Sequence, residues 1–192
     1  MRQNLGENSV LVCSSAPADD ASAWVQRFAS LIPEGGRVLD LACGYGRHAR
    51  LLAGLGFQVE ALDRDPEALA ALADCPGVTV RQADIEGGPW PYYAEVFDAV
   101  VVTNYLWRPL LPQIVKVVEQ GGVLIYETFM VGNEQFGKPS NPAFLLRTNE
   151  LLDLVRNRMR IVAFEQGQVR HPRLAMMQRI CAVRANSGAL EK

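Results

Sequence analysis

An acid and two glycines stand close together after a short apolar run. Val38, Leu39 and Leu41 have the character of a strand that is buried on both faces, and Asp40 lies near its end. Gly44 and Gly46 follow, and glycines at such a turn let a ligand approach the backbone closely. The next residues resemble the start of a helix, whose unpaired N–H groups would point into the same gap. The spacing therefore predicts a ligand site.

Two further acids follow the next two predicted strands. Asp63 comes after residues 58–62, and Asp84 follows the strand that begins at residue 78. Because the carboxyl ends of parallel strands meet at one edge of a sheet, both carboxylates are expected in the same crevice. Asp63 could accept hydrogen bonds from a ribose diol, and Asp84 could accept one from an adenine amino group. The ligand predicted by these acids is a nucleoside.

The glycine turn by itself does not choose between cofactors. Gly44, Gly46 and Ala49 also satisfy the relaxed dinucleotide fingerprint, with an acid about 20 residues further on. Asp40 favours the other interpretation, because its carboxylate would repel a pyrophosphate and attract the ammonium group of a methionine moiety. NAD stays an alternative at this point, and S-adenosylmethionine (SAM) is the favoured cofactor.

The series Asp40-x-x-x-Gly44-x-Gly46, Asp63 and Asp84 resembles the motifs of class I SAM-dependent methyltransferases. It is most similar to their small, single-domain, tellurite-resistance-like members, over roughly residues 22–183, with Ala42 where the family commonly has glycine. The resemblance implies an α/β fold: a doubly wound, seven-stranded, mostly parallel sheet with a C-terminal antiparallel hairpin. It also implies SAM contacts from Asp40, Ala42, Gly44, Gly46, Arg47, Asp63, Arg64, Asp84, Ile85 and Asn104.

The elements that must position these residues alternate along the chain. We expect an arm over residues 1–16, a methyltransferase domain over 17–185 and a tail over 186–192. Asp19 or Asp20 is expected to cap a first helix, and a capping box at Thr148 a late one. Strands are predicted at 37–41, 58–63, 78–82, 97–102, 123–127, 160–168 and 174–184, and further helices at 46–54, from 65, at 110–118 and up to 155.

The segment from residue 128 to residue 147 lacks periodicity and carries three phenylalanines, which is typical of a substrate lid. The candidates for catalysis are Asn104 and Tyr105, after the fourth strand, and Glu127, at the end of the fifth. Arg108 could bind an anionic substrate. His48 is interpreted equally well as a donor in the site and as an ordinary helix residue.

Methyl transfer from a sulfonium needs alignment of the acceptor and exclusion of water, and a general base only where the acceptor is protonated. No metal is expected, because no metal-ligand spacing is present. The acceptor is expected to be a small molecule. The alternatives are tRNA or protein as the acceptor, an NAD-linked oxidoreductase, and a non-catalytic SAM-binding module.

Composition limits the possible partners. The net charge of −2 and the pI near 5.7 argue against a broadly basic nucleic-acid surface, so nucleic acid is not the expected partner. The four cysteines are scattered, as in a reducing cytoplasm, and neither a signal peptide nor a membrane span is recognised. We expect a cytoplasmic monomer or homodimer that makes no membrane contact.

Overall fold

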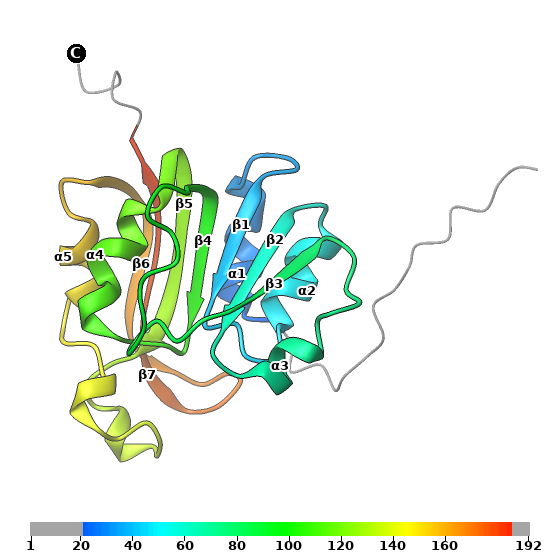
Figure 1. Cartoon of the computed structure of the whole chain (residues 1–192). Helices are drawn as coiled ribbons and strands as arrows, with labels where there is room; N and C mark the ends of the chain where they lie inside the picture. The colour runs from blue at the N-terminus through cyan, green and yellow to red at the C-terminus, as the bar shows by residue number, and fades with distance from the viewer. Residues whose placement is uncertain (1–20, 186–192) are drawn as a thin grey trace, which may run out of the picture.

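The computed structural model describes residues 21–185 of the 192-residue chain, and its centre is one seven-stranded sheet (Figure 1). The strand order is β3-β2-β1-β4-β5-β7-β6. Neighbouring strands from β3 to β5 pair in parallel, whereas β7 is antiparallel to both β5 and β6. The strands are β1 Arg37–Leu41, β2 Gln58–Asp63, β3 Val78–Gln82, β4 Phe97–Thr103, β5 Val118–Phe129, β6 Met159–Val169 and β7 Ala175–Arg184. The predicted fold class is confirmed.

Helices cover both faces of the sheet. The bounds are α1 Ala23–Phe28, α2 Arg47–Gly54, α3 Pro66–Ala70, α4 Leu111–Lys116 and α5 Glu150–Val155, with short 3-10 helices at η1 Ala29–Leu31, η2 Arg108–Leu110, η3 Asn133–Gln135 and η4 Pro142–Phe144. One apolar core joins α1, α2 and the end of α3 to one face, and a second core joins α4 and α5 to the other. Strands buried on both faces need consecutive apolar residues, and residues 99–102 of β4 meet that need with no exposed surface.

Most predicted element bounds agree with the structure to within a few residues, and the differences have local causes. Ser22, not a preceding aspartate, caps α1, because its side chain accepts from the Trp24 N–H at 3.0 Å. Asp19 and Asp20 lie outside the described residues, as do the expected N-terminal arm and C-terminal tail. The helix predicted for 110–118 ends at Lys116, since β5 already begins at Val118 and runs through the glycine pair.

The late helix begins differently from the predicted capping box. Asn149, with φ of 63°, precedes α5 and caps it without a side-chain hydrogen bond. The carboxylate of Glu150 instead accepts from the backbone N–H of Arg147 at 2.7 Å, which turns the chain into the helix.

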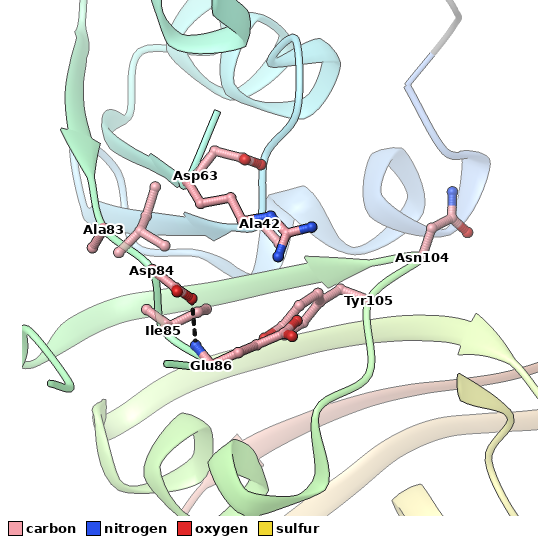
Figure 2. Close-up of a pocket in the computed structure, with 10 residues that line it drawn as sticks. Ala42, Asp63, Ala83, Asp84, Ile85, Glu86, Asn104 and Tyr105 are labelled. Carbon is pink, nitrogen blue, oxygen red and sulfur yellow. Dashed lines mark hydrogen bonds between the residues drawn. The ribbon is translucent and has the colours of Figure 1, made fainter. Parts of the chain in front are cut away.

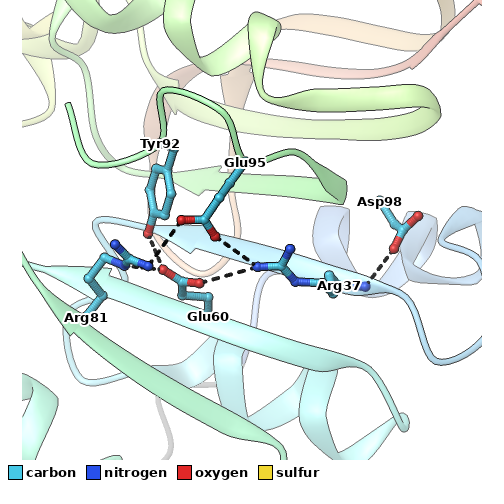
Figure 3. A network of polar contacts seen from close by, with 6 residues as sticks. All are labelled: Arg37, Glu60, Arg81, Tyr92, Glu95 and Asp98. Carbon is cyan, nitrogen blue, oxygen red and sulfur yellow. Dashed lines mark hydrogen bonds and ion pairs between the residues drawn. The ribbon is translucent and has the colours of Figure 1, made fainter.

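A polar network connects β1, β2 and β3 to the loop between β3 and β4 (Figure 3). Glu60 of β2 is at its centre: its carboxylate accepts from Arg81 and from the Tyr92 hydroxyl, the latter at 2.8 Å, and lies 3.8 Å from Arg37. Glu95 pairs with both arginines from the loop side. With its side chain only 12% exposed, Glu60 is a nearly buried charge that depends on these partners.

We predict that Glu60→Gln lowers the free energy of unfolding by about 1–3 kcal/mol, because it weakens hydrogen bonds to charged and buried partners. Urea unfolding followed by circular dichroism measures the change. Glu34→Gln, at an exposed position, is the control and should stay within about 0.5 kcal/mol of the wild type. Equal stabilities for the two variants would contradict a structural role for the network.

Candidate functional site

A pocket of about 260 Å³ opens at the carboxyl ends of β1, β2, β3 and β4 (Figure 2). Its position is the edge at which open α/β sheets bind ligands. The wall contains apolar, uncharged polar and charged residues: Ala42, Leu62, Asp63, Arg64, Ala83, Asp84, Ile85, Glu86, Asn104 and Tyr105.

The glycine turn is held against β2 by one carboxylate. Asp63 accepts from the Gly44 N–H at 2.8 Å through one oxygen and from the Asp65 N–H at 3.0 Å through the other. Gly44 has φ of +54°, and a Cβ built there would meet no protein atom within 4 Å. The space beside Gly44 is therefore free of protein atoms, as a ligand cradle requires.

Gly46 is a glycine for a different reason. Its φ is +76°, and an added Cβ would lie 2.4 Å from the side chain of Leu72. Leu72 is fully buried in the core that packs α2 and α3 on the sheet. Gly46 thus serves the packing of the turn, whereas Gly44 leaves the ligand space open.

Asp40 lies beneath this turn and is 1% exposed. Burial raises the pKa of its carboxyl group to about 7, although a hydrogen bond from the Ala49 N–H and the charge of Arg47 partly oppose that rise. Its oxygen Oδ2 has no hydrogen-bond partner among the described residues. A buried carboxylate oxygen without a partner is costly, and a cationic ligand group would relieve that cost.

Asp84 and Tyr105 form the opposite wall. Asp84 accepts from the N–H groups of Glu86 and Gly87 at 3.0 and 3.1 Å, and these bonds lower its pKa, so it stays ionised. Burial and the neighbouring charge of Glu86 raise the pKa of Tyr105, so its hydroxyl stays protonated. Figure 2 shows the Tyr105 ring beside Glu86 in this wall.

His48 is buried and holds its neighbours together. Its Nε2 accepts from the Ser22 N–H at 3.1 Å, which places the proton on Nδ1, 3.3 Å from the hydroxyl of Thr103. Burial and the charge of Arg47 lower the pKa of His48 to about 3. The structure favours the interpretation of His48 as a neutral connector between α1, α2 and β4.

Glu127 is 4% exposed and pairs with Arg179 of β7, with 3.1 Å between Oε2 and Nε. Glu127 does not line the pocket. Its neighbour in β4, Thr103, contacts His48. Arg108 was expected to bind an anionic substrate, but its guanidinium instead makes hydrogen bonds to other residues of the chain. Its guanidinium holds Glu150 at 2.7 and 2.9 Å and donates to two carbonyl groups of residues 143–145.

The pocket gathers many of the residues predicted from the sequence: Ala42, Asp63, Arg64, Asp84, Ile85, Asn104 and Tyr105. Asp40, Gly44, Gly46 and Arg47 lie at the adjoining turn instead. Glu86 was missed, along with Leu62 and Ala83. The one signal for Glu86 was its position two residues after Asp84, in the same turn. Among residues 21–185 there is no group of three acidic, histidine or cysteine side chains that could hold a metal, and no helix long and apolar enough to cross a membrane.

We predict that Asp40 makes stability fall as the pH rises. Its folded pKa of about 7 exceeds the ordinary value of 3.8, so its contribution is complete below pH 3.8 and is lost as the pH rises through 7. Urea unfolding from pH 4 to 8 should show the wild type losing up to about 4 kcal/mol relative to Asp40→Asn. His48 has the opposite effect, because its lowered pKa makes stability fall as the pH drops below 6.5. Both proteins contain His48, so its effect cancels in the comparison. The exposed control Asp74→Asn should follow the wild type, and parallel curves for Asp40→Asn would refute the prediction.

Known sequences are similar to the part of the chain that contains the pocket. Residues 38–122 match the family model described as a methyltransferase domain. A putative methyltransferase of Bacillus subtilis, YqeM, is 47% identical over 127 residues, which cover 59% of this chain. The match spans 49% of YqeM, so this chain corresponds to about half the length of that relative.

Solved structures resemble the whole fold. TehB from Haemophilus influenzae superposes with a TM-score of 0.68 at 22% identity, over 84% of this chain and 61% of TehB. The glycopeptide N-methyltransferase MtfA, in complex with S-adenosylhomocysteine, superposes with a TM-score of 0.61 at 21% identity, over 86% of this chain and 90% of MtfA. The expected resemblance to the tellurite-resistance-like methyltransferases is thus confirmed at the level of fold. The chain thus contains a region that is similar to a methyltransferase domain, and it shares its fold with TehB and MtfA.

Proposed function

We propose that this protein transfers the methyl group of SAM to a small-molecule acceptor. The observation that carries the proposal is the unpartnered, buried Asp40 carboxylate oxygen beneath a glycine turn with open space at Gly44. A cofactor with a cationic amino-acid end would supply the missing partner. The adjoining pocket offers the polar groups that a nucleoside end requires.

Each end of SAM has its own partners in this proposal. Asp63 would accept from the ribose diol while it still holds the Gly44 N–H, since a carboxylate has several acceptor positions. Asp84 and the buried side chain of Ile85 would hold the adenine. Asp40 and Arg47 would bind the ammonium and carboxylate of the methionine end, respectively. The residues present therefore fit the cofactor.

SAM would supply a methyl group that is already activated by the positive charge on sulfur. In the transfer, a lone pair of the acceptor forms the new bond to carbon while the carbon–sulfur bond breaks, and its electron pair stays on sulfur. The protein then has to orient the acceptor and exclude water. Asn104 and Tyr105, at the end of β4, are proposed to orient it, and Tyr105 can donate because its hydroxyl stays protonated. Glu127 is the reserve candidate for a base, although Arg179 already binds it.

The second candidate is a methyltransferase that acts on tRNA or protein. The small-molecule acceptor is preferred because the net charge is −2 and the pocket is compact. A cytoplasmic location and a monomeric or homodimeric state remain expectations from the sequence. The expected division into a domain over 17–185 with flanking arm and tail is likewise a proposal.

We predict that SAM and S-adenosylhomocysteine, but not NAD, stabilise the protein. A ligand at one hundred times its dissociation constant adds about 2.7 kcal/mol, which raises the Tm of a domain of this size by roughly 5–10 °C. Differential scanning calorimetry with each ligand in parallel measures this shift. Stabilisation by NAD alone would overturn the proposal. SAM binding without S-adenosylhomocysteine release on any acceptor would instead favour a non-catalytic binding module.

We predict that Gly44→Ala weakens SAM binding by at least about tenfold, because the new methyl group enters the ligand space. Gly35→Ala is the matched control: Gly35 also has a positive φ, +67°, and open surroundings, but it lies before β1 at the opposite edge of the sheet. Both variants should lose similar stability, because both place a side chain at a positive φ. A difference in SAM affinity, measured by isothermal titration, would then come from steric blockage of the ligand space at Gly44 and not from backbone strain. Equal SAM affinities for the two variants would contradict the placement of the cofactor.

A further inference from the structure

Two segments that are far apart in the sequence form a cationic lobe on an otherwise acidic protein. Residues 135–147, from the lid, and residues 166–178, around the turn between β6 and β7, together contain one lysine and three arginines and no aspartate or glutamate. The whole chain has a net charge of −2, so the remainder carries a clear negative excess. We call this pair of segments the basic lobe.

The basic lobe contains a second pocket, of about 470 Å³, separate from the one beside Asp63 and Asp84. Its lining has two cations, one aromatic ring and no acid: Lys138, Pro139, Ser140, Asn141, Phe144 and Arg173. Phe144 is 45% exposed, so its ring is open to a ligand. An apolar ring beside cations is the arrangement that recognises an acid with an apolar body.

Internal contacts hold this pocket in shape. Arg173 lies with its guanidinium 5.2 Å from the Phe129 ring centroid and donates to the Lys138 carbonyl at 3.1 Å. That bond uses one of the five N–H groups of the guanidinium, so others can reach a ligand. Asn133, 2% exposed, fastens the lid to the hairpin: it donates to the Pro139 carbonyl at 2.9 Å and accepts from the Met176 N–H at 3.1 Å.

The basic lobe also adjoins the edge at which the cofactor site lies. The lid leaves β5 directly after Phe129, and two residues earlier the Glu127 carbonyl accepts from the N–H of Asn104, which lines the cofactor pocket. In Figure 1 the lid (yellow) and the turn between β6 and β7 (orange) both project past the carboxyl edge of the sheet, on the same side as α3. An acceptor anchored in the basic lobe is therefore at the end of the sheet where transfer would occur.

We propose that the pocket of the basic lobe binds the anionic group of the methyl acceptor, which is a small organic acid with an apolar or aromatic body. Lys138 and Arg173 hold the acid group, and Phe144 packs on the body. This inference rests on the proposed function and adds the class of acceptor to it. Two cations at one pocket suit a single small anion better than the extended basic groove along which an RNA strand runs.

The first experiment uses a probe of the proposed chemistry, 8-anilinonaphthalene-1-sulfonate, and its uncharged analogue N-phenyl-1-naphthylamine. Fluorescence titration of the full chain should show tighter binding of the sulfonate. The double variant Lys138→Gln/Arg173→Gln should weaken it by about tenfold or more, since charge-assisted contacts are lost. Phe144→Ala should weaken both dyes. The matched control Arg170→Gln removes one charge from the basic lobe outside the pocket and should change binding by less than about twofold.

The second experiment measures SAM affinity and turnover with the same proteins. SAM affinity should be unchanged in every variant. Release of S-adenosylhomocysteine should be faster with aromatic acids that carry an amino, hydroxyl or thiol group than with their carboxamides. The double variant should remove that preference by raising KM for the acids.

The outcomes separate the two proposals. Sulfonate binding that is equal in wild type and double variant, or faster turnover with the carboxamides, would overturn the acid pocket while SAM binding stands. Binding of a 20-nucleotide RNA that Arg170→Gln weakens as much as Lys138→Gln or Arg173→Gln would replace it with a nucleic-acid surface. A chain that binds the dye but not SAM would overturn the proposed function, and the acceptor role with it.

Discussion

The hydrogen bond from the Gly44 N–H to Asp63 is the contact on which the site depends. It joins the turn after β1 to the end of β2, and the Cys43 N–H reinforces the junction through the Leu62 carbonyl at 3.0 Å. The same carboxylate receives the Asp65 N–H, and Asp65 in turn caps α3. One side chain thereby sets the glycine turn and the start of α3, so the cradle is formed before any ligand arrives.

Charge is distributed unevenly around the carboxyl edge of the sheet. Acids gather where the cofactor is proposed to bind, and they differ in environment: Asp40 is buried beneath the turn, whereas Asp84 is exposed and held ionised by backbone N–H groups. Two cations, Lys138 and Arg173, line the pocket of the basic lobe. A cationic cofactor and an anionic acceptor would each meet complementary charge, and this separation would orient the pair.

The lid is held by contacts with residues far away in the sequence, which the sequence pattern of the lid does not predict. Arg108 follows β4, yet its guanidinium holds the lid through the carbonyl groups of Ala143 and Leu145. Gln178 of β7 is fully buried, donates to the Arg147 carbonyl at 3.1 Å and accepts from the Leu151 N–H at 2.6 Å. Such satisfied buried polar groups specify one conformation, because leaving any of them unpaired would be costly.

The sequence by itself determined the sheet, the glycine turn and the acids at the strand ends. Those features follow from local causes: consecutive apolar residues make buried strands, and a glycine turn between a strand and a helix makes a cradle. Only the tertiary structure decided which partner each polar side chain takes. Arg108 and Glu127 had the residue types of a substrate site, but Glu150 and Arg179, distant in sequence, occupy them. Pairing of this kind depends on which segments the fold brings together, and the spacing of residues along the chain does not predict it.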